Sequence, residues 1–87
     1  MELKDTISGM VSEDYKERFR AEYWQTSIRT AALAHIIINY NKLNFKTACP
    51  KNILEEQLKS MSDYLNILQK RAIIEKIPLI KEENKNA

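Results

Sequence analysis

The stretch from Tyr15 to Trp24 interleaves aromatic and charged side chains, and it is the part of this 87-residue chain whose composition best suits ligand binding. Between Tyr15 and Lys51 there are seven basic residues, opposed only by Glu17 and Glu22. Aromatic rings stack on nucleobases, and the guanidinium fork of arginine binds phosphate. The stretch is compatible with an anionic ligand that contains aromatic rings, and its spacing alone does not decide the matter. Core aromatic residues beside a solvated charged face also explain the stretch.

Other reactive side chains do not form a catalytic set. His35 is the only histidine and Cys49 the only cysteine, and several helical turns separate them along the predicted helix. We expect His35 to be packed or at an interface and Cys49 to be a small buried residue. One cysteine and one histidine do not supply a zinc-ligand set, and a single glycine cannot build a phosphate-binding loop. We therefore expect no enzyme, no metal and no cofactor.

Arg71 is a further candidate ligand residue. It lies on a partly apolar row of the last predicted helix, where a cation needs an anionic partner. Glu75, one helical turn further along, can be that partner.

Composition indicates a small all-α domain in a reducing cytoplasm. One glycine and two prolines are too few for the turns of a β-sandwich or barrel. The hydrophobic share of 44% argues against disorder, and the formal charge of +2 is too low for a dedicated nucleic-acid binder. The N-terminal segment does not resemble a signal peptide, and apolar runs are too short for a membrane span.

Helix signals divide the chain into five segments. One or two helical turns within Met1–Val11, weakened by Gly9, precede a helix of roughly 28 residues that starts at Ser12 as its N-cap. A loop over 41–50 leads to a second long helix that starts at Pro50, runs to Glu75 or Lys76 and is ended by Pro78. We expect one domain over 1–80, a short N-terminal helix followed by a long antiparallel helical hairpin, and a polar tail over 81–87.

Both long helices carry more apolar surface than one hairpin covers. A seam at alternating steps of four and three residues marks the last helix: Leu54, Leu58, Met61, Leu65, Leu68 and Ala72. A second, partly apolar row runs beside it: Ile53, Gln57, Ser60, Tyr64, Ile67, Arg71 and Ile74. The first long helix has one face with Phe19, Tyr23, Thr26, Leu33, Ile37 and Tyr40, and another with Trp24, Ile28, Ala31, His35 and Ile38.

This spare apolar surface predicts a homo-oligomer, a dimer at least, with the second rows at subunit interfaces. The alternative is a monomer in which the N-terminal helix covers the second face. Leu3, Ile7 and Met10 are few residues for that purpose.

The chain also resembles a family of small phage and prophage proteins over roughly residues 2–77. The first long helix carries the resemblance at Asp14-Tyr15-Lys16, Arg18-Phe19, Glu22-Tyr23, Gln25 and Ile28-Arg29. The second half carries it at Cys49-Pro50, Leu54, Gln57, Met61, Tyr64-Leu65, Leu68, Arg71-Ala72 and Glu75. These proteins are similar to the helical-hairpin domain of the phage sponges that counter the CBASS and Thoeris defences.

The resemblance implies an immune-evasion sponge in the cytoplasm of the bacterial host. Such a sponge binds cyclic di- or trinucleotides, or cyclic ADP-ribose isomers, between the subunits of a dimer or hexamer and does not turn them over. The matching residue types imply these ligand-binding candidates: Tyr15, Arg18, Arg20, Tyr23, Arg29 and Arg71. The chain departs from its relatives after Arg29, where residues 30–38 are almost wholly apolar, so we expect a tighter interface or a changed pocket there.

Two other functions are compatible with the residues. A non-catalytic helical module would bind a protein partner through the spare apolar rows and would need no small-molecule ligand. A small DNA-binding regulator is the third possibility, but the low net charge and the lack of a helix-turn-helix pattern argue against it.

Overall fold

The computed structural model describes residues 1–42 and 48–80, and regular structure within them is entirely helical. The predicted tail over 81–87 and the middle of the predicted loop, 43–47, lie outside the described residues. In chain order the elements are the 3₁₀ turn η1 (Leu3–Thr6), α1 (Ile7–Met10), α2 (Tyr15–Ile38), the 3₁₀ turn η2 (Tyr40–Lys42) and α3 (Lys51–Glu75).

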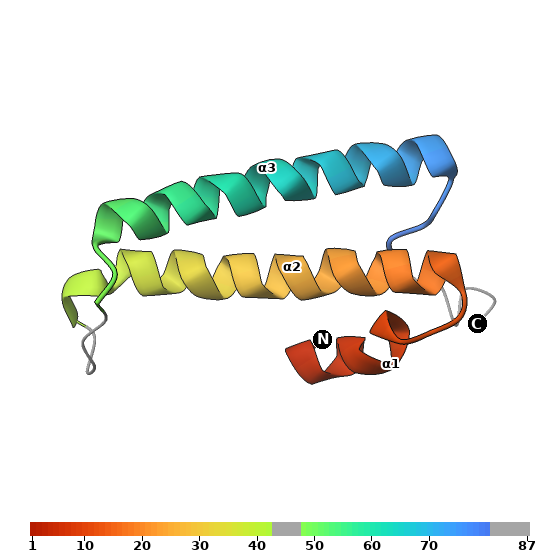
Figure 1. Ribbon diagram of the computed structural model, residues 1–87, viewed down its shortest axis with the longest axis horizontal. Helices are drawn as coiled ribbons and strands as arrows, with labels where there is room; N and C mark the ends of the chain where they lie inside the picture. The colour runs from red at the N-terminus through yellow and green to blue at the C-terminus, as the bar shows by residue number, and fades with distance from the viewer. Residues whose placement is uncertain (43–47, 81–87) are drawn as a thin grey trace.

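The two long helices form the predicted hairpin. Figure 1 shows α2 and α3 running side by side in opposite directions, with η1 and α1 on the other side of α2, beneath its first half. No helix in the described part of the chain is long and apolar enough to cross a membrane.

The start of α2 differs from the prediction by a few residues. Asp14, not Ser12, is the N-cap, and its carboxylate accepts a hydrogen bond from the Lys16 amide at 3.0 Å. The Ser12 hydroxyl instead accepts from the Asp14 amide at 3.0 Å and donates to Glu17 at 2.8 Å. Ser12 therefore orders the turn before the helix, while the carboxylate of Asp14 occupies the position that the helix dipole favours.

The end of α3 agrees with the prediction. Lys76 terminates the helix in the left-handed conformation, with φ of 58°. The next amide, of Ile77, donates to the Ala72 carbonyl at 2.9 Å, which is the six-to-one bond of a Schellman motif. This turn directs the Ile77 side chain into the core and sends Ile77–Ile80 back toward α2.

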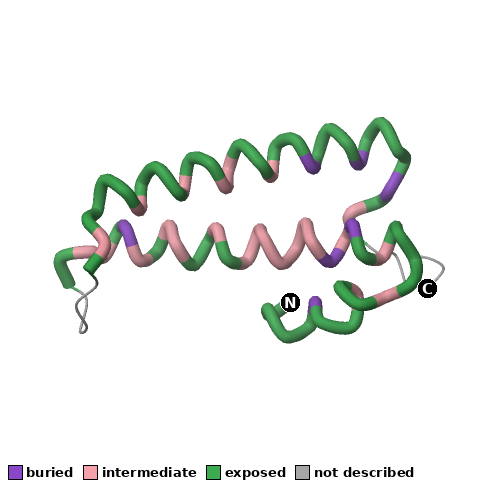
Figure 2. The backbone as a smooth tube through the Cα atoms, viewed as in Figure 1, coloured by how far each residue is buried: buried purple, intermediate pink, exposed green. Residues whose placement is uncertain are grey.

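The core lies where the predicted seam of α3 meets the first face of α2. Every seam residue is buried or half-buried, and so is every residue of the first α2 face. Phe19, Leu68, Ala72 and Ile77 form its centre, and Tyr23, Leu65 and Leu79 pack around them. Figure 2 shows that most buried positions gather at the end of the hairpin where α2 begins and α3 ends.

The second rows behave differently on the two helices. All seven residues of the second α3 row are exposed within this chain. On α2, Trp24 and Ile28 are half-buried, whereas Ala31, His35 and Ile38 are exposed. The N-terminal segment therefore covers only the first half of the second α2 face, and apolar surface remains uncovered on both long helices.

Candidate functional site

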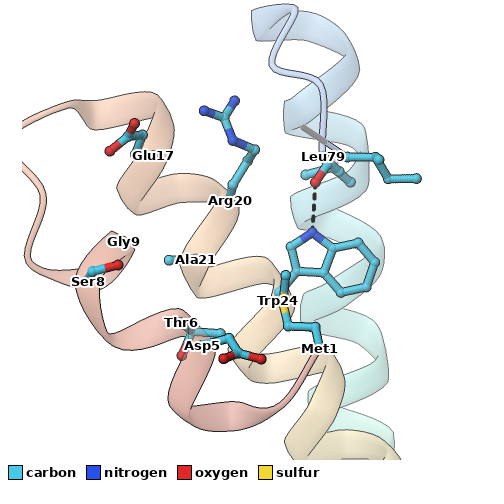
Figure 3. A pocket seen from close by; sticks show the side chains of 11 residues that line it. Met1, Asp5, Thr6, Ser8, Gly9, Glu17, Arg20, Ala21, Trp24 and Leu79 are labelled. Atoms are coloured by element: carbon cyan, nitrogen blue, oxygen red, sulfur yellow. Dashed lines mark hydrogen bonds between the residues drawn. The ribbon is translucent and has the colours of Figure 1, made fainter. Parts of the chain in front are cut away.

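A cavity of about 440 Å³ lies between the N-terminal segment, α2 and the chain that follows α3. Figure 3 shows the lining side chains around it. They come from three parts of the chain: Met1, Asp5, Thr6, Ser8 and Gly9; Glu17, Arg20, Ala21 and Trp24; and Leu79 and Ile80. The cavity is open on one side to solvent, so a bound ligand would remain partly exposed.

A close approach of two helices forms the floor of this cavity. A β-carbon placed on Gly9 would lie 2.8 Å from the β-carbon of Ala21, closer than two such atoms approach in proteins. Glycine at this position in α1 and alanine at the facing position in α2 therefore bring the two backbones together. Thr6 is buried beside them, and its hydroxyl donates to the Leu3 carbonyl at 2.7 Å.

Trp24 forms one wall. Its indole N–H donates to the Leu79 carbonyl at 2.7 Å, and its ring meets Tyr23 edge-on with centroids 5.1 Å apart. Both contacts fix the orientation of the indole. Because the N–H is already used, the ring offers a ligand its π face rather than a hydrogen-bond donor.

Arg20 is the one basic side chain among the residues that line the cavity. The residue is half-buried, and the only hydrogen bond from its side chain to the described residues is a long one, 3.4 Å from the guanidinium group to the Pro78 carbonyl. The guanidinium group therefore keeps most of its five N–H donors for a ligand. Figure 3 shows Arg20 and Glu17 at the same end of the cavity, with Asp5 and Met1 at the other.

Tyr15 and Arg71 lie outside the cavity, in a polar network that joins α2 to α3. Arg71 donates to Glu75 at 2.9 Å, which confirms the predicted pair, and its guanidinium lies 4.9 Å from the centroid of the Phe19 ring. The Tyr15 hydroxyl donates to the other Glu75 oxygen at 2.8 Å and accepts from Arg71. The hydrogen bonds from Tyr15 and Arg71 lower the pKa of Glu75, and the bond to Glu75 raises the pKa of Tyr15.

The other three predicted ligand residues are dispersed. Tyr23 faces α3, where its hydroxyl accepts from the Gln69 amide at 3.0 Å. Arg18 is exposed and donates to the Ser12 carbonyl at 2.8 Å, so it supports the turn before α2. Arg29 is exposed, and none of the described residues forms a hydrogen bond or an ion pair with its side chain. Of the six predicted residues, the structure thus brings only Arg20 to the cavity.

A second contact between α2 and α3 joins Glu22 to Tyr64, on the side of the hairpin that carries Arg18 and Arg29; we call this side the flank. Glu22 occupies the same row of α2, one turn after Arg18, and accepts a hydrogen bond from the Tyr64 hydroxyl. This bond raises the pKa of Tyr64. The flank also carries Ile67 of α3, which is half exposed.

Several lining residues were missed by the sequence reasoning. The sequence places Trp24 on the second face of its helix and in the aromatic-basic stretch. Arg20 lies one helical turn earlier, and this spacing is the signal that could have placed the two side chains at one site. Asp5 and Leu79 carry no such signal. Their positions depend on how the N-terminal segment and the chain after Pro78 fold back on α2, and that is a property of the tertiary structure.

Comparison with known proteins gives one relationship. Neither the curated proteins nor the solved structures contain a significant match to the chain. The sequence model of the Sequestin family matches residues 13–74, which include α2, the loop and nearly all of α3. Because the match spans well over half of the chain, the protein belongs to the Sequestin family.

Proposed function

We propose that this protein is a phage-encoded sponge that sequesters a cyclic nucleotide second messenger of bacterial antiphage defence. The family name suggests a sequestering role. The observation that carries the proposal is the pairing of Trp24 and Arg20 in one cavity, an aromatic face beside an underused guanidinium group. We place its action in the host cytoplasm and propose that the ligand is bound and released unchanged.

The chemistry of the cavity fits one nucleotide unit. Stacking of a base on an aromatic side chain contributes about 1–3 kcal/mol, and arginine binds phosphate through two parallel, charge-assisted hydrogen bonds. A ligand of two or three such units would extend through the open side of the cavity. Binding of this kind requires no metal and no catalytic group.

We also propose that the protein works as a homo-oligomer. Within the chain, Ile53 is 45% exposed, Ile67 50% and Ile74 77%, and all three lie on the second row of α3. A second copy packed on this row would cover them, and it would place a new surface beside Arg18 and Arg29. These two predicted ligand residues would then contact a ligand only at a subunit interface.

The same isoleucines support a second candidate function, a helical interaction module whose apolar row binds a different protein. That function needs neither the cavity nor Arg20. Substitution of Arg20 therefore separates the two functions.

The test is thermal melting of the purified protein with cyclic dinucleotides, cyclic trinucleotides and cyclic ADP-ribose isomers. A ligand that binds only the folded state adds about 2.7 kcal/mol at one hundred times its Kd, which raises the Tm of a small domain by several degrees. We expect one ligand class to give this shift and R20Q to abolish it. The matched control is K16Q, which removes an exposed basic residue of the same helix outside the cavity.

Each other outcome has a definite meaning. Loss of the shift in R29Q but not in R20Q would move the ligand from the cavity to the flank of Arg29. No shift with any ligand, while the protein melts cooperatively, would overturn sequestration and leave the interaction module.

A further inference from the structure

The ionisable side chains that line the cavity carry more negative than positive charge. The lining includes two carboxylates, Asp5 and Glu17, and one guanidinium group, Arg20. A site that recognises several phosphates by charge would show the opposite balance. The lining therefore limits how many phosphate groups the cavity accepts.

In each carboxylate, one oxygen accepts a hydrogen bond from the described residues and the other does not. One Asp5 oxygen accepts from the Glu2 amide at 2.7 Å, and one Glu17 oxygen accepts from the Ser12 hydroxyl at 2.8 Å. The second oxygen of each has no hydrogen-bond partner among residues 1–42 and 48–80. These oxygens accept hydrogen bonds and donate none, so the ligand groups that suit them are hydroxyls and amines.

The two carboxylates occupy different ends of the cavity. Figure 3 shows Glu17 at the same end of the cavity as Arg20, whereas Asp5 lies at the far end and the Trp24 ring lies to one side. A phosphate bound by Arg20 would already approach Glu17, and a second phosphate would be repelled. A ribose placed toward Asp5 would meet a carboxylate, the group that reads ribose hydroxyls in dinucleotide-binding folds.

We propose that the cavity selects a nucleotide unit with a single phosphate and a free ribose hydroxyl. Asp5 accepts from the hydroxyl, Arg20 binds the phosphate, and Glu17 opposes further negative charge at that end. This inference rests on the proposed function, because it assumes that the cavity binds a nucleotide, and it names the part of the ligand that the cavity recognises.

The fluorescence of Trp24 allows ligand binding in the cavity to be measured directly. Trp24 is the only tryptophan of the chain and forms a wall of the cavity. A base that stacks on the indole quenches its fluorescence. Selective excitation of tryptophan therefore reports binding at this site.

The experiment titrates the full chain with three adenine nucleotides that differ by one feature each. Adenosine 5′-monophosphate is the reference, 2′,3′-dideoxyadenosine 5′-monophosphate lacks the hydroxyls, and adenosine 5′-diphosphate adds a phosphate. We expect the dideoxy compound to bind about tenfold more weakly than the reference, the effect of one hydrogen bond to a charged group. We expect the diphosphate to bind more weakly as well.

Two variants assign these preferences to residues. D5N should bring the affinities of the monophosphate and its dideoxy analogue together, while the dideoxy affinity itself stays unchanged and shows that the cavity is intact. E17Q should improve binding of the diphosphate relative to the monophosphate. The controls are D63N and E13Q, which remove exposed carboxylates outside the cavity and should change neither ratio.

Failure of the inference and failure of the proposed function look different. Equal binding of the monophosphate and its dideoxy analogue by the native protein, or a preference that survives D5N, would overturn the inference and leave the sponge function standing. Absence of quenching by the monophosphate at millimolar concentration would also overturn it. The melting experiment with the cyclic ligands tests the proposed function separately.

Discussion

At the residue scale, Arg71 shows how a predicted ligand residue is used inside the fold. Its guanidinium group contacts Glu75, Tyr15 and the Phe19 ring at once, so it connects the last turns of α3 to the first turns of α2. The side chain remains 46% exposed. Solvent therefore screens the ion pair with Glu75, and the cation–π contact is of the exposed kind.

We expect R71Q to lower the free energy of unfolding, because it removes a partly exposed ion pair and a cation–π contact. The Tm of R71Q should fall by a few degrees relative to the native chain. Calorimetry checks the value. The control is K59Q, which breaks the exposed Lys59–Asp63 pair on the same helix and should change the Tm little. Equal effects of the two variants would show that the Arg71 network does not stabilise the fold.

The carboxylate of Glu75 adds a pH dependence. Hydrogen bonds from Tyr15 and Arg71 lower its folded-state pKa below the ordinary value of 4.5. The stabilisation is therefore complete above that value and is lost as the pH falls through the lower, folded-state pKa. We expect the Tm to decline on acidification below about pH 5 and E75Q to decline less. Melting curves across this range check the prediction, and identical acid slopes for the two proteins would contradict it.

At the element scale, the hairpin is the part that the sequence predicted well. Leu54, Leu65 and Leu68 repeat at the spacing of a packed seam, and a periodic pattern of this kind is independent of the rest of the fold. The cap was misassigned by two residues because Ser12 and Asp14 are both good caps and only the local backbone distinguishes them. The cavity was not predicted, because it depends on where α1 settles against α2.

Gly9 determines how closely α1 packs against α2. Glycine lowers helix propensity by about 1 kcal/mol relative to alanine, so G9A should stabilise α1 if only propensity mattered. We expect the opposite, a loss of about 1–3 kcal/mol, because the added methyl group would overlap Ala21 and displace α1. Melting and limited proteolysis of the N-terminal segment check this result.

The control for this variant is S8A. It changes the neighbouring position of the same short helix and keeps the β-carbon already present there, so it should leave the Tm and the proteolysis pattern unchanged. A G9A protein that is more stable than the native chain would show that α1 does not pack closely on α2.

At the scale of the whole molecule, two adjacent residues of α3 have different roles, one in the fold of the chain and the other in its proposed assembly. Leu68 is 1% exposed in the core, whereas Ile67 is half exposed on the second row. Truncation of a buried leucine to alanine lowers the free energy of unfolding by about 2–5 kcal/mol, whereas substitution of an exposed residue in a monomer changes it very little. An exposed isoleucine matters only when another molecule covers it.

We expect I67E to dissociate the proposed homo-oligomer and to leave each chain folded, because a buried carboxylate without a partner disfavours the interface. Sedimentation equilibrium gives the mass of the assembly, and circular dichroism gives the helix content. The matched control is E56Q, on the exposed side of the same helix. A native protein that sediments as a monomer would contradict the proposed assembly and leave the isoleucine row to another partner.

Native mass spectrometry of the protein incubated with the cyclic nucleotide panel tests the central claim most directly, because it weighs the assembly and its ligand together. We expect an oligomer of the chain that carries one class of cyclic nucleotide, and the same mass of ligand after denaturation. A spectrum without ligand at saturating concentration, or release of a ligand whose mass has changed, would contradict sequestration without turnover.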